Sequence, residues 1–138
     1  MAVVAYINFK GNAREAVGFY ADVFGVEKPV ISTYGEQKSD FPLPDAVKDR
    51  VMHAELNIFG GSVMFSDVFD DQQYKVGNNI SITLISADKE ALEKAFNKLA
   101  DGGQVGVELQ QTFWSSLYGF VTDQYGIGWQ VSHDAAKS

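Results

Sequence analysis

Two patterns of hydrophobic and polar positions run along the chain, and each predicts one kind of element. Stretches that are apolar and β-prone, or that alternate between apolar and polar residues, predict strands. Stretches in which apolar residues return every three to four positions predict amphipathic helices. The first pattern occupies residues 2–9, 30–34, 50–59, 62–67, 79–86, 104–111, 118–122 and 127–131, and the second occupies 13–24 and 88–100.

Glycine-containing and polar segments separate these elements. Asn12, with Glu15 three positions later, predicts a capping box at the start of the first helix, and Gly25 is suited to end that helix. Gly60-Gly61 predicts a two-residue hairpin turn. Residues 35–49 contain Pro42 and Pro44 and show no periodicity, so we expect a long loop there.

A group of aspartates follows the strand over residues 62–67. Asp67, Asp70 and Asp71 lack the spacing of an EF-hand, and no glutamate occupies the twelfth position of such a loop. We therefore interpret the group as a solvated linker, with Asp67 more suited to capping a turn than to acid catalysis.

The order of predicted elements is the same in both halves of the chain. Each half contains a strand, a helix and then three strands, so the sequence predicts two βαβββ modules, about 1–70 and about 78–134, in a single domain over 1–138. This arrangement is of the α+β class. Because each module alone leaves one sheet face uncovered, and twisted sheets curl, we expect a cleft on the concave side of the curved mixed sheets.

Composition narrows the classes of protein and of chemistry. The 138 residues carry a formal net charge of −7 and no basic cluster, which argues against a protein that binds nucleic acid. The absence of cysteine excludes disulfides and thiolate chemistry. The apolar residues of Met1–Val4 lack the basic segment with which a signal peptide begins. No apolar run reaches the about 20 residues that span a membrane, so we expect a cytoplasmic protein with no membrane segment.

Two regions carry side chains suited to a site. His53, Glu55 and Asn57 fall on one face of the predicted strand over 50–59, about 6.5–7 Å apart in steps of two residues. His53 is either a pocket base or a solvent-facing histidine, and Glu55 is either its partner or a surface carboxylate. Trp114 is either a flat wall for a ligand or a core or interface residue. Trp129 and Gln130 point to opposite faces, so if Gln130 lines a pocket, Trp129 packs behind the sheet.

Three separated blocks of the chain resemble one family. They are Tyr6-Ile7-Asn8-Phe9 with Gly11-Asn12 and Phe19-Tyr20; His53-Ala54-Glu55-Leu56 with Ser66-Asp67 and Asn78-Asn79; and Thr112-Phe113-Trp114 with Tyr118-Gly119, Thr122-Asp123 and Trp129. In this order and spacing they are similar to the PhnB-like branch of the vicinal-oxygen-chelate superfamily, which contains glyoxalases, bleomycin-resistance proteins and extradiol dioxygenases.

The resemblance implies a glyoxalase/bleomycin-resistance/dioxygenase-like fold, a homodimer, and a pocket on each concave sheet. In the superfamily's enzymes a divalent ion is held there by His, Glu or Gln from four strands. By position these ligands fall on Ala5, on or near Phe65, on Ile80 or Ser81, and on Gln130. Alanine and phenylalanine cannot bind a metal, and such a cation needs three or four ligands in fixed geometry.

We therefore predict a small-molecule-binding protein without the usual metal centre. The predicted pocket residues are His53, Glu55, Phe65, Ser81, Trp114, Tyr118 and Gln130. No cofactor is predicted, and a methyl-donor site is not expected because no glycine-rich strand–helix turn occurs. The alternatives are a divalent-metal-dependent lyase, isomerase or dioxygenase using His53, Glu55 and Gln130; a DNA-associated regulator, which some labels in this branch suggest; and a structural module with no ligand.

Overall fold

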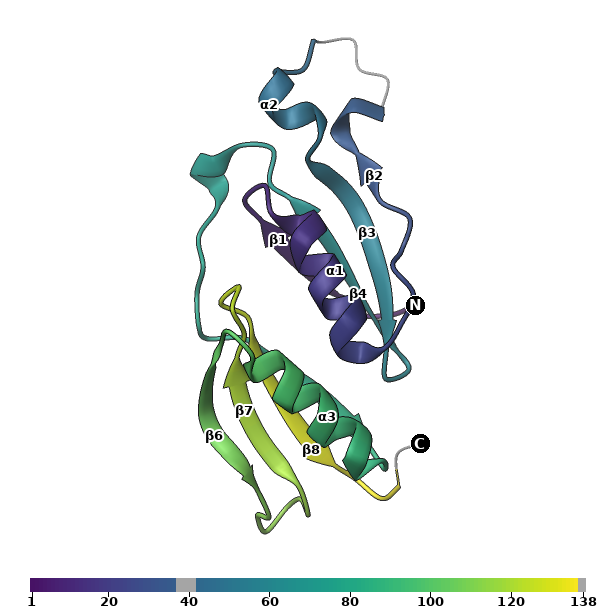
Figure 1. The fold of residues 1–138 in the computed structure, drawn as a ribbon, viewed down its shortest axis with the longest axis vertical. Helices are drawn as coiled ribbons and strands as arrows, with labels where there is room; N and C mark the ends of the chain where they lie inside the picture. Colours follow the sequence, from purple (N-terminus) through teal and green to yellow (C-terminus); the bar gives the residue numbers. More distant parts are fainter. Residues whose placement is uncertain (37–41, 137–138) are drawn as a thin grey trace. The chain divides into compact units, whose positions relative to one another are not determined.

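The same succession of elements occurs twice in the chain (Figure 1), and each copy forms its own compact unit, Met1–Lys75 and Val76–Ser138. This computed structural model describes residues 1–36 and 42–136. The first unit contains β1 (Ala5–Phe9), α1 (Ala13–Phe24), β2 (Ser32–Thr33), the 3-10 turn η1 (Tyr34–Glu36), α2 (Asp45–Lys48), β3 (Val51–Ile58), β4 (Gly61–Asp67) and the 3-10 turn η2 (Asp71–Gln73). The second contains β5 (Ser81–Ser86), α3 (Lys89–Ala100), β6 (Gln104–Gln110), β7 (Tyr118–Thr122) and β8 (Gly128–His133).

Each unit is built on a four-stranded mixed sheet. The strand orders are β1-β4-β3-β2 and β5-β8-β7-β6, so the first strand of each unit lies beside its last. That contact is parallel, and the other pairs are antiparallel. A parallel return needs a crossover, which the single long helix of each unit supplies. The predicted α+β fold of paired βαβββ modules is confirmed.

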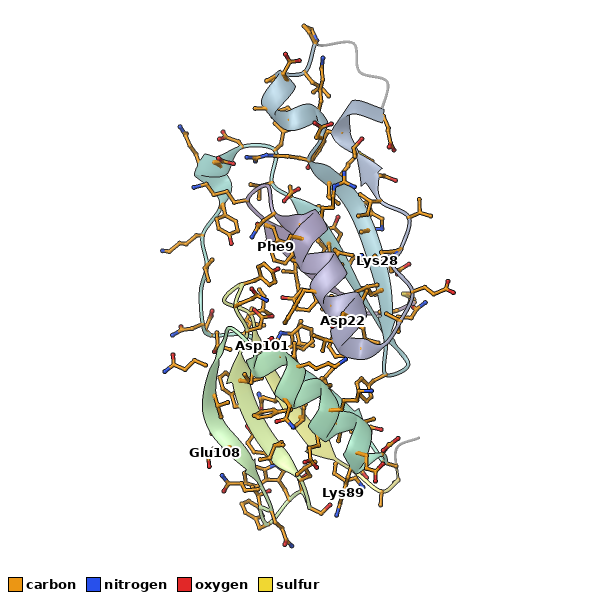
Figure 2. The ribbon with its side chains drawn as sticks, viewed as in Figure 1. Phe9, Asp22, Lys28, Lys89, Asp101 and Glu108 are labelled. Atoms are coloured by element: carbon orange, nitrogen blue, oxygen red, sulfur yellow. The ribbon has the colours of Figure 1, made fainter. Side chains whose placement is uncertain are left out.

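The core of the first unit lies between α1 and one face of its sheet. The Phe65 ring is fully buried there, with ring centroids 5.6 Å from Tyr20 and 6.4 Å from Phe9. Figure 2 shows Phe9 in this unit. Of the apolar positions in the helical pattern, α1 buries Ala13, Ala16, Val17, Tyr20 and Val23; it also buries Ala21, whereas Phe24 stays half-buried. The 3.6-residue period of the sequence thus determines which side of the helix meets the sheet.

The core of the second unit contains Trp129. Its side chain is fully buried, and its Nε1–H donates to Asp123 Oδ2 at 2.8 Å. The other carboxylate oxygen of Asp123 accepts from the backbone N–H groups of Tyr125 and Ile127 at 2.8 and 3.1 Å, which ties the β7–β8 turn to the core. The prediction that Trp129 packs on the face opposite Gln130 is confirmed by their alternating burial.

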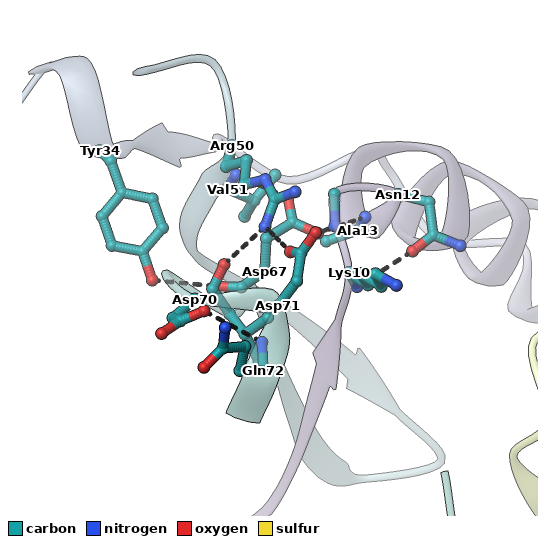
Figure 3. A network of polar contacts seen from close by, with 12 residues as sticks. Lys10, Asn12, Ala13, Tyr34, Arg50, Val51, Asp67, Asp70, Asp71 and Gln72 are labelled. Atoms are coloured by element: carbon teal, nitrogen blue, oxygen red, sulfur yellow. Dashed lines mark hydrogen bonds and ion pairs between the residues drawn. The ribbon is translucent and has the colours of Figure 1, made fainter. Parts of the chain in front are cut away.

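The predicted capping box of α1 does not form. Asn12 occupies the N-cap position but makes no side-chain cap hydrogen bond; its Oδ1 accepts from the Lys10 backbone N–H at 3.3 Å. Instead Asp67, at the end of β4, accepts from the backbone N–H groups of Gly11 and Ala13 at 2.8 and 2.9 Å (Figure 3). The cap therefore comes from a strand more than fifty residues away, which no local motif could indicate.

Asp67 also corrects the interpretation of the aspartate group as a solvated linker. Its side chain is 1% exposed, and its second oxygen accepts from the Val51 backbone N–H at 2.9 Å. The sequence predicts a turn cap, but Asp67 caps the start of α1 and the start of β3 instead. Asp70 and Asp71 are exposed as expected, although Asp71 forms an ion pair with Arg50 at 2.6 Å.

Two turns differ from the sequence prediction. Ile58 pairs with Gly61, so the hairpin turn is Phe59-Gly60, with φ of 48° and 79°, and not Gly60-Gly61. Positive φ at both central residues is typical of a type I′ turn, whose backbone twist matches the twist of the two flanking strands. The predicted loop over 35–49 contains the end of η1 and the short α2, whose Val47 is buried; residues 37–41 of it, and residues 137–138, lie outside the described residues.

None of the helices in the described ranges, 1–36 and 42–136, is long and apolar enough to cross a membrane.

Candidate functional site

Three of the predicted pocket residues meet on the face of the second sheet that α3 does not cover. In register, Gln130 lies opposite Thr83 on one side and Phe120 on the other, and Tyr118 lies opposite Ser132. Because paired residues share a face and neighbours along a strand alternate, Ser81, Gln130 and Tyr118 lie on the face opposite to buried Trp129. We call this surface the open face.

A chain of hydrogen bonds joins these three side chains into a row. Tyr118 donates its hydroxyl hydrogen to Gln130 Oε1 at 2.6 Å, and Gln130 Nε2 donates to Ser81 Oγ at 2.7 Å. The row spans β7, β8 and β5. Because each bond uses one donor and one acceptor, the row retains the Ser81 hydroxyl hydrogen and the second Gln130 amide hydrogen as donors. The lone pairs of the Tyr118 oxygen remain as acceptors.

Two exposed aromatic rings stand at the Tyr118 end of the row. The Trp114 ring is centred 5.3 Å from Tyr118, and the Phe113 ring 4.7 Å from Trp114, both edge to face. Phe113 is 96% exposed and Trp114 is 57% exposed. The next residue along the chain, Ser115, is buried, and its hydroxyl lies 2.8 Å from the Leu117 carbonyl and 3.0 Å from the His133 backbone nitrogen.

Beside these rings the surface is hollowed. The hollow has a volume of about 500 Å³ and lies where the 111–117 segment meets the ends of β5 and β8. Its walls include Ile85, Phe113, Trp114, Ser116, Ser132 and His133. A volume of this size suits a small organic molecule.

The two remaining polar candidates lie in the first unit. His53 Nδ1 is 3.3 Å from the Tyr6 hydroxyl, with ring centroids 6.0 Å apart, and Glu55 accepts a hydrogen bond from Ser62. They share the sheet face opposite α1, since the alternating residues Ala54 and Leu56 are buried. No contact between His53 and Glu55 is present among the described residues.

Phe65 lies on the other face of that sheet. It pairs with Ile7 and Ala54 and is buried against Tyr20, so we leave it out of the candidate site. The period of two along β4 explains this placement, because Met64 and Ser66 on either side of Phe65 face the opposite way. Counting positions by family resemblance had placed Phe65 in the pocket.

The donor set does not fit the metal centre of the superfamily. Ala5 pairs with Val63 and so faces the same way as Phe65, and neither side chain offers a lone pair. Within the described ranges, no group of three or more His, Cys, Asp or Glu side chains is arranged to hold a metal ion. On the open face the side chains that could ligate a metal are one amide and hydroxyls, which are weak ligands for a divalent cation.

Around Asp67, polar side chains of the first unit form a network of contacts (Figure 3). The pKa values of Tyr34 and Asp71 are shifted in this network. Tyr34 donates to the Asp67 carbonyl at 2.8 Å, and burial, with smaller contributions from Tyr6 and Asp67, raises the pKa of Tyr34. The hydrogen bond from Arg50 lowers the pKa of Asp71. Tyr34 therefore keeps its proton and acts as a donor.

Sequence reasoning missed Phe113, Ser116 and His133 as wall residues of the hollow. The 111–117 segment carries no periodicity that indicates which side chains point inward. His133 ends β8 and pairs with Ser86, which lies just before α3. Only the sheet register shows this pairing, so the sequence could not place His133 at the hollow.

The fold places the protein in a known structural class. A solved glyoxalase/bleomycin resistance protein/dioxygenase family enzyme from Burkholderia phytofirmans PsJN matches with a TM-score of 0.60 at 13% identity, over 94% of this chain and 95% of that one. At that identity the likeness shows the fold alone. The class is therefore that of the glyoxalase/bleomycin-resistance/dioxygenase superfamily fold.

Within that class, the profile of the 3-demethylubiquinone-9 3-methyltransferase family matches residues 1–132, so the chain belongs to this family. Protein YjdN of Escherichia coli is 27% identical over 96% of this chain and 95% of its own length. The crystal structure of PA1353 from Pseudomonas aeruginosa is 34% identical, with a TM-score of 0.82 over 97% and 98% of the two chains. A PhnB protein from Bacillus cereus is 25% identical, with a TM-score of 0.76 over 97% and 100%. The PhnB-like resemblance is confirmed.

Proposed function

We propose that this protein binds a small, uncharged, planar organic molecule on the open face of its second sheet. One observation carries the proposal: the Tyr118–Gln130–Ser81 row lies on an uncovered sheet face beside the exposed Trp114 ring. A fixed polar row next to an exposed aromatic wall is the usual composition of a small-molecule site. The row orients a ligand, and the wall contributes apolar contact.

The hydrogen-bond directions select the ligand's polar groups. Two donors, from Ser81 and Gln130, suit a carbonyl oxygen, while the Tyr118 oxygen suits an N–H or O–H of the same molecule. A ring placed against Trp114 would present both groups to the row. A ring bearing a carbonyl next to a hydroxyl or amine meets these requirements.

Charge supports an uncharged ligand. Strands β5, β6, β7 and β8 and the 111–117 segment contain no lysine or arginine, and the described lysines of the second unit lie on α3, such as Lys89 (Figure 2). A phosphonate or carboxylate bound at the row would lack a cationic partner, which charged ligands need when they leave water.

Methyl transfer, which the family description names, is not what we propose. The backbone N–H groups at the β1–α1 turn, where an anionic cofactor group could bind a helix N-terminus, already donate to Asp67. The weak set of metal ligands likewise argues against metal-dependent lyase or dioxygenase chemistry at Ala5, Phe65 and Gln130.

We retain the homodimer and a cytoplasmic location as part of the proposal, on the family resemblance. Light scattering tests the dimer.

Tryptophan fluorescence and thermal shift test the binding proposal together. Trp114 is exposed and Trp129 is fully buried, so a ligand on the open face should change only the solvent-exposed emission. We expect neutral ring compounds with a carbonyl and an adjacent donor to raise the melting temperature, because a ligand at 100 times its Kd stabilises by about 2.7 kcal/mol. Matched anionic analogues should not.

The variants decide where such compounds bind. Gln130→Ala removes the centre of the row and should weaken a hit by about 10- to 100-fold, from lost hydrogen bonds of about 1–3 kcal/mol. Trp114→Ala should weaken it comparably. Asn57→Ala, an exposed residue on the first sheet, is the control and should not change binding. Hits that bind both site variants as tightly as wild type, or a preference for anions, would contradict the proposal.

A further inference from the structure

A serine and a histidine meet at the hollow beside the open face. Ser116 Oγ lies 2.5 Å from His133 Nδ1, and His133 Nε2 lies 3.0 Å from the Ala87 carbonyl oxygen. Ser116 is exposed in the 111–117 segment, and both residues line the hollow. The ring is therefore held from both of its nitrogens.

The Ala87 contact determines the tautomer of the neutral ring. A carbonyl oxygen only accepts hydrogen bonds, so Nε2 carries the hydrogen. Nδ1 then has a lone pair, and the Ser116 hydroxyl is the donor in the 2.5 Å contact. A hydroxyl that donates to an imidazole, which a third group orients in turn, is the arrangement that activates serine nucleophiles.

The main chain around the pair is fixed as well. The His133 backbone N–H donates to the Leu117 carbonyl at 2.9 Å, and the buried Ser115 hydroxyl lies 3.1 Å from the His133 carbonyl. These contacts tie the segment that carries Ser116 to the end of β8. The distance between hydroxyl and imidazole is thus set by several bonds in addition to its own.

The hollow has room for a substrate. Its volume is about 500 Å³, and Phe113, Trp114 and Ile85 give it apolar and aromatic walls next to the Ser116 hydroxyl. Such walls suit an apolar or aryl group, and no lysine or arginine lines the hollow for an anionic substrate.

We propose that Ser116 and His133 form a nucleophile and general base that hydrolyse small apolar or aryl esters. The Ser116 oxygen attacks the ester carbonyl carbon while its proton passes to His133 Nδ1. The carbon–oxygen bond to the alcohol breaks, and the alcohol leaves with that proton. Water then attacks the acyl-serine, loses a proton to Nδ1, and releases the carboxylic acid as the serine regains its hydrogen. Ester and water are the only reactants.

This activity does not depend on the Tyr118–Gln130–Ser81 row. Gln130→Ala should therefore leave ester hydrolysis unchanged while it weakens binding on the open face. Failure of one proposal is thereby distinguishable from failure of the other.

Covalent labelling tests the nucleophile without any substitution. Phenylmethylsulfonyl fluoride transfers its sulfonyl group to an activated serine oxygen, with loss of fluoride and a proton. We expect one adduct on intact wild-type protein, located at Ser116 by peptide mass spectrometry, and none in His133→Gln. No adduct, or an adduct elsewhere, would overturn the proposal.

Turnover of p-nitrophenyl acetate and p-nitrophenyl benzoate is the second measurement. Ser116→Ala should lower kcat/KM at least about 100-fold, the scale on which acid–base catalysis operates. Its melting temperature should stay close to that of wild type, since the Ser116 side chain is exposed. Asn57→Ala is the control: Asn57 is exposed on the first sheet and does not line the hollow, so this variant should keep the wild-type rate. A smaller loss in Ser116→Ala refutes the mechanism.

Discussion

Asp67→Ala should be among the most destabilising single substitutions in the first unit. The Asp67 carboxylate is 1% exposed and accepts three backbone N–H groups, from Gly11, Ala13 and Val51, at 2.8 to 2.9 Å. The bonds to Ala13 and Val51 are buried. Leaving a buried donor unsatisfied costs about 2 kcal/mol, so the two together cost about 4 kcal/mol. Gly11 is partly solvated and adds little.

Guanidinium unfolding followed by circular dichroism measures this loss. We expect the midpoint to fall with an unchanged slope, since the surface exposed on unfolding stays the same. The melting temperature should drop by roughly 15 °C for a chain of this size. Asp67→Asn keeps one acceptor oxygen but turns an amide hydrogen toward a donor, so its loss should be intermediate.

Asp70→Ala provides the comparison. Asp70 lies three residues away, is exposed, and accepts only from the Gln72 backbone N–H at 3.0 Å. Its removal should cost less than about 1 kcal/mol. If Asp67→Ala costs no more than Asp70→Ala, then Asp67 does not hold α1 and β3 together, and the cap assigned to it is wrong.

Two further predictions concern a pair of glycines and an ion pair. Gly18 lies inside α1 with an ordinary φ, so Gly18→Ala should stabilise the protein by about 0.5–1 kcal/mol. Gly25 has a φ of 64°, so Gly25→Ala should destabilise the protein by about 1 kcal/mol, although its Cβ would meet nothing within 4 Å. Thermal melts in which both variants shift the melting temperature in the same direction would contradict this. The Arg50 hydrogen bond lowers the pKa of Asp71, so the stability it contributes is present above the unfolded pKa near 4 and is lost as pH falls through the lower folded value. Asp71→Asn should therefore flatten part of the stability loss on acidification, and an acid limb identical to wild type in unfolding titrations would refute this.

Local patterns were sufficient for the eight strands, the two long helices and their order, although they missed the short α2. The helical period over 13–24 selects the residues that α1 buries, and the alternation along β8 separates buried Trp129 from Gln130. The repeat of one strand, one helix and three strands predicts both modules. Each of these rests on interactions between residues a few positions apart, which the sequence displays directly.

Contacts between distant residues needed the tertiary structure. The sequence suggested Ser81, Tyr118 and Gln130 as separate candidates, but only the register of β5, β8 and β7 joins them into one row. Family position suggested Phe65 for the pocket, whereas its burial against Tyr20 is a tertiary contact that the sequence does not display.

The same limit explains the helix cap and the Ser116–His133 pair. Asn12 and Glu15 match a local capping motif, yet the carboxylate of Asp67 reaches the same N–H groups from another strand. Ser116 meets His133 because β8 ends beside the 111–117 segment. By itself the sequence determined which segments are strands and helices and which faces are apolar. The tertiary structure decided which polar groups meet, because hydrogen bonds depend on positions of a few tenths of an ångström between residues far apart in the chain.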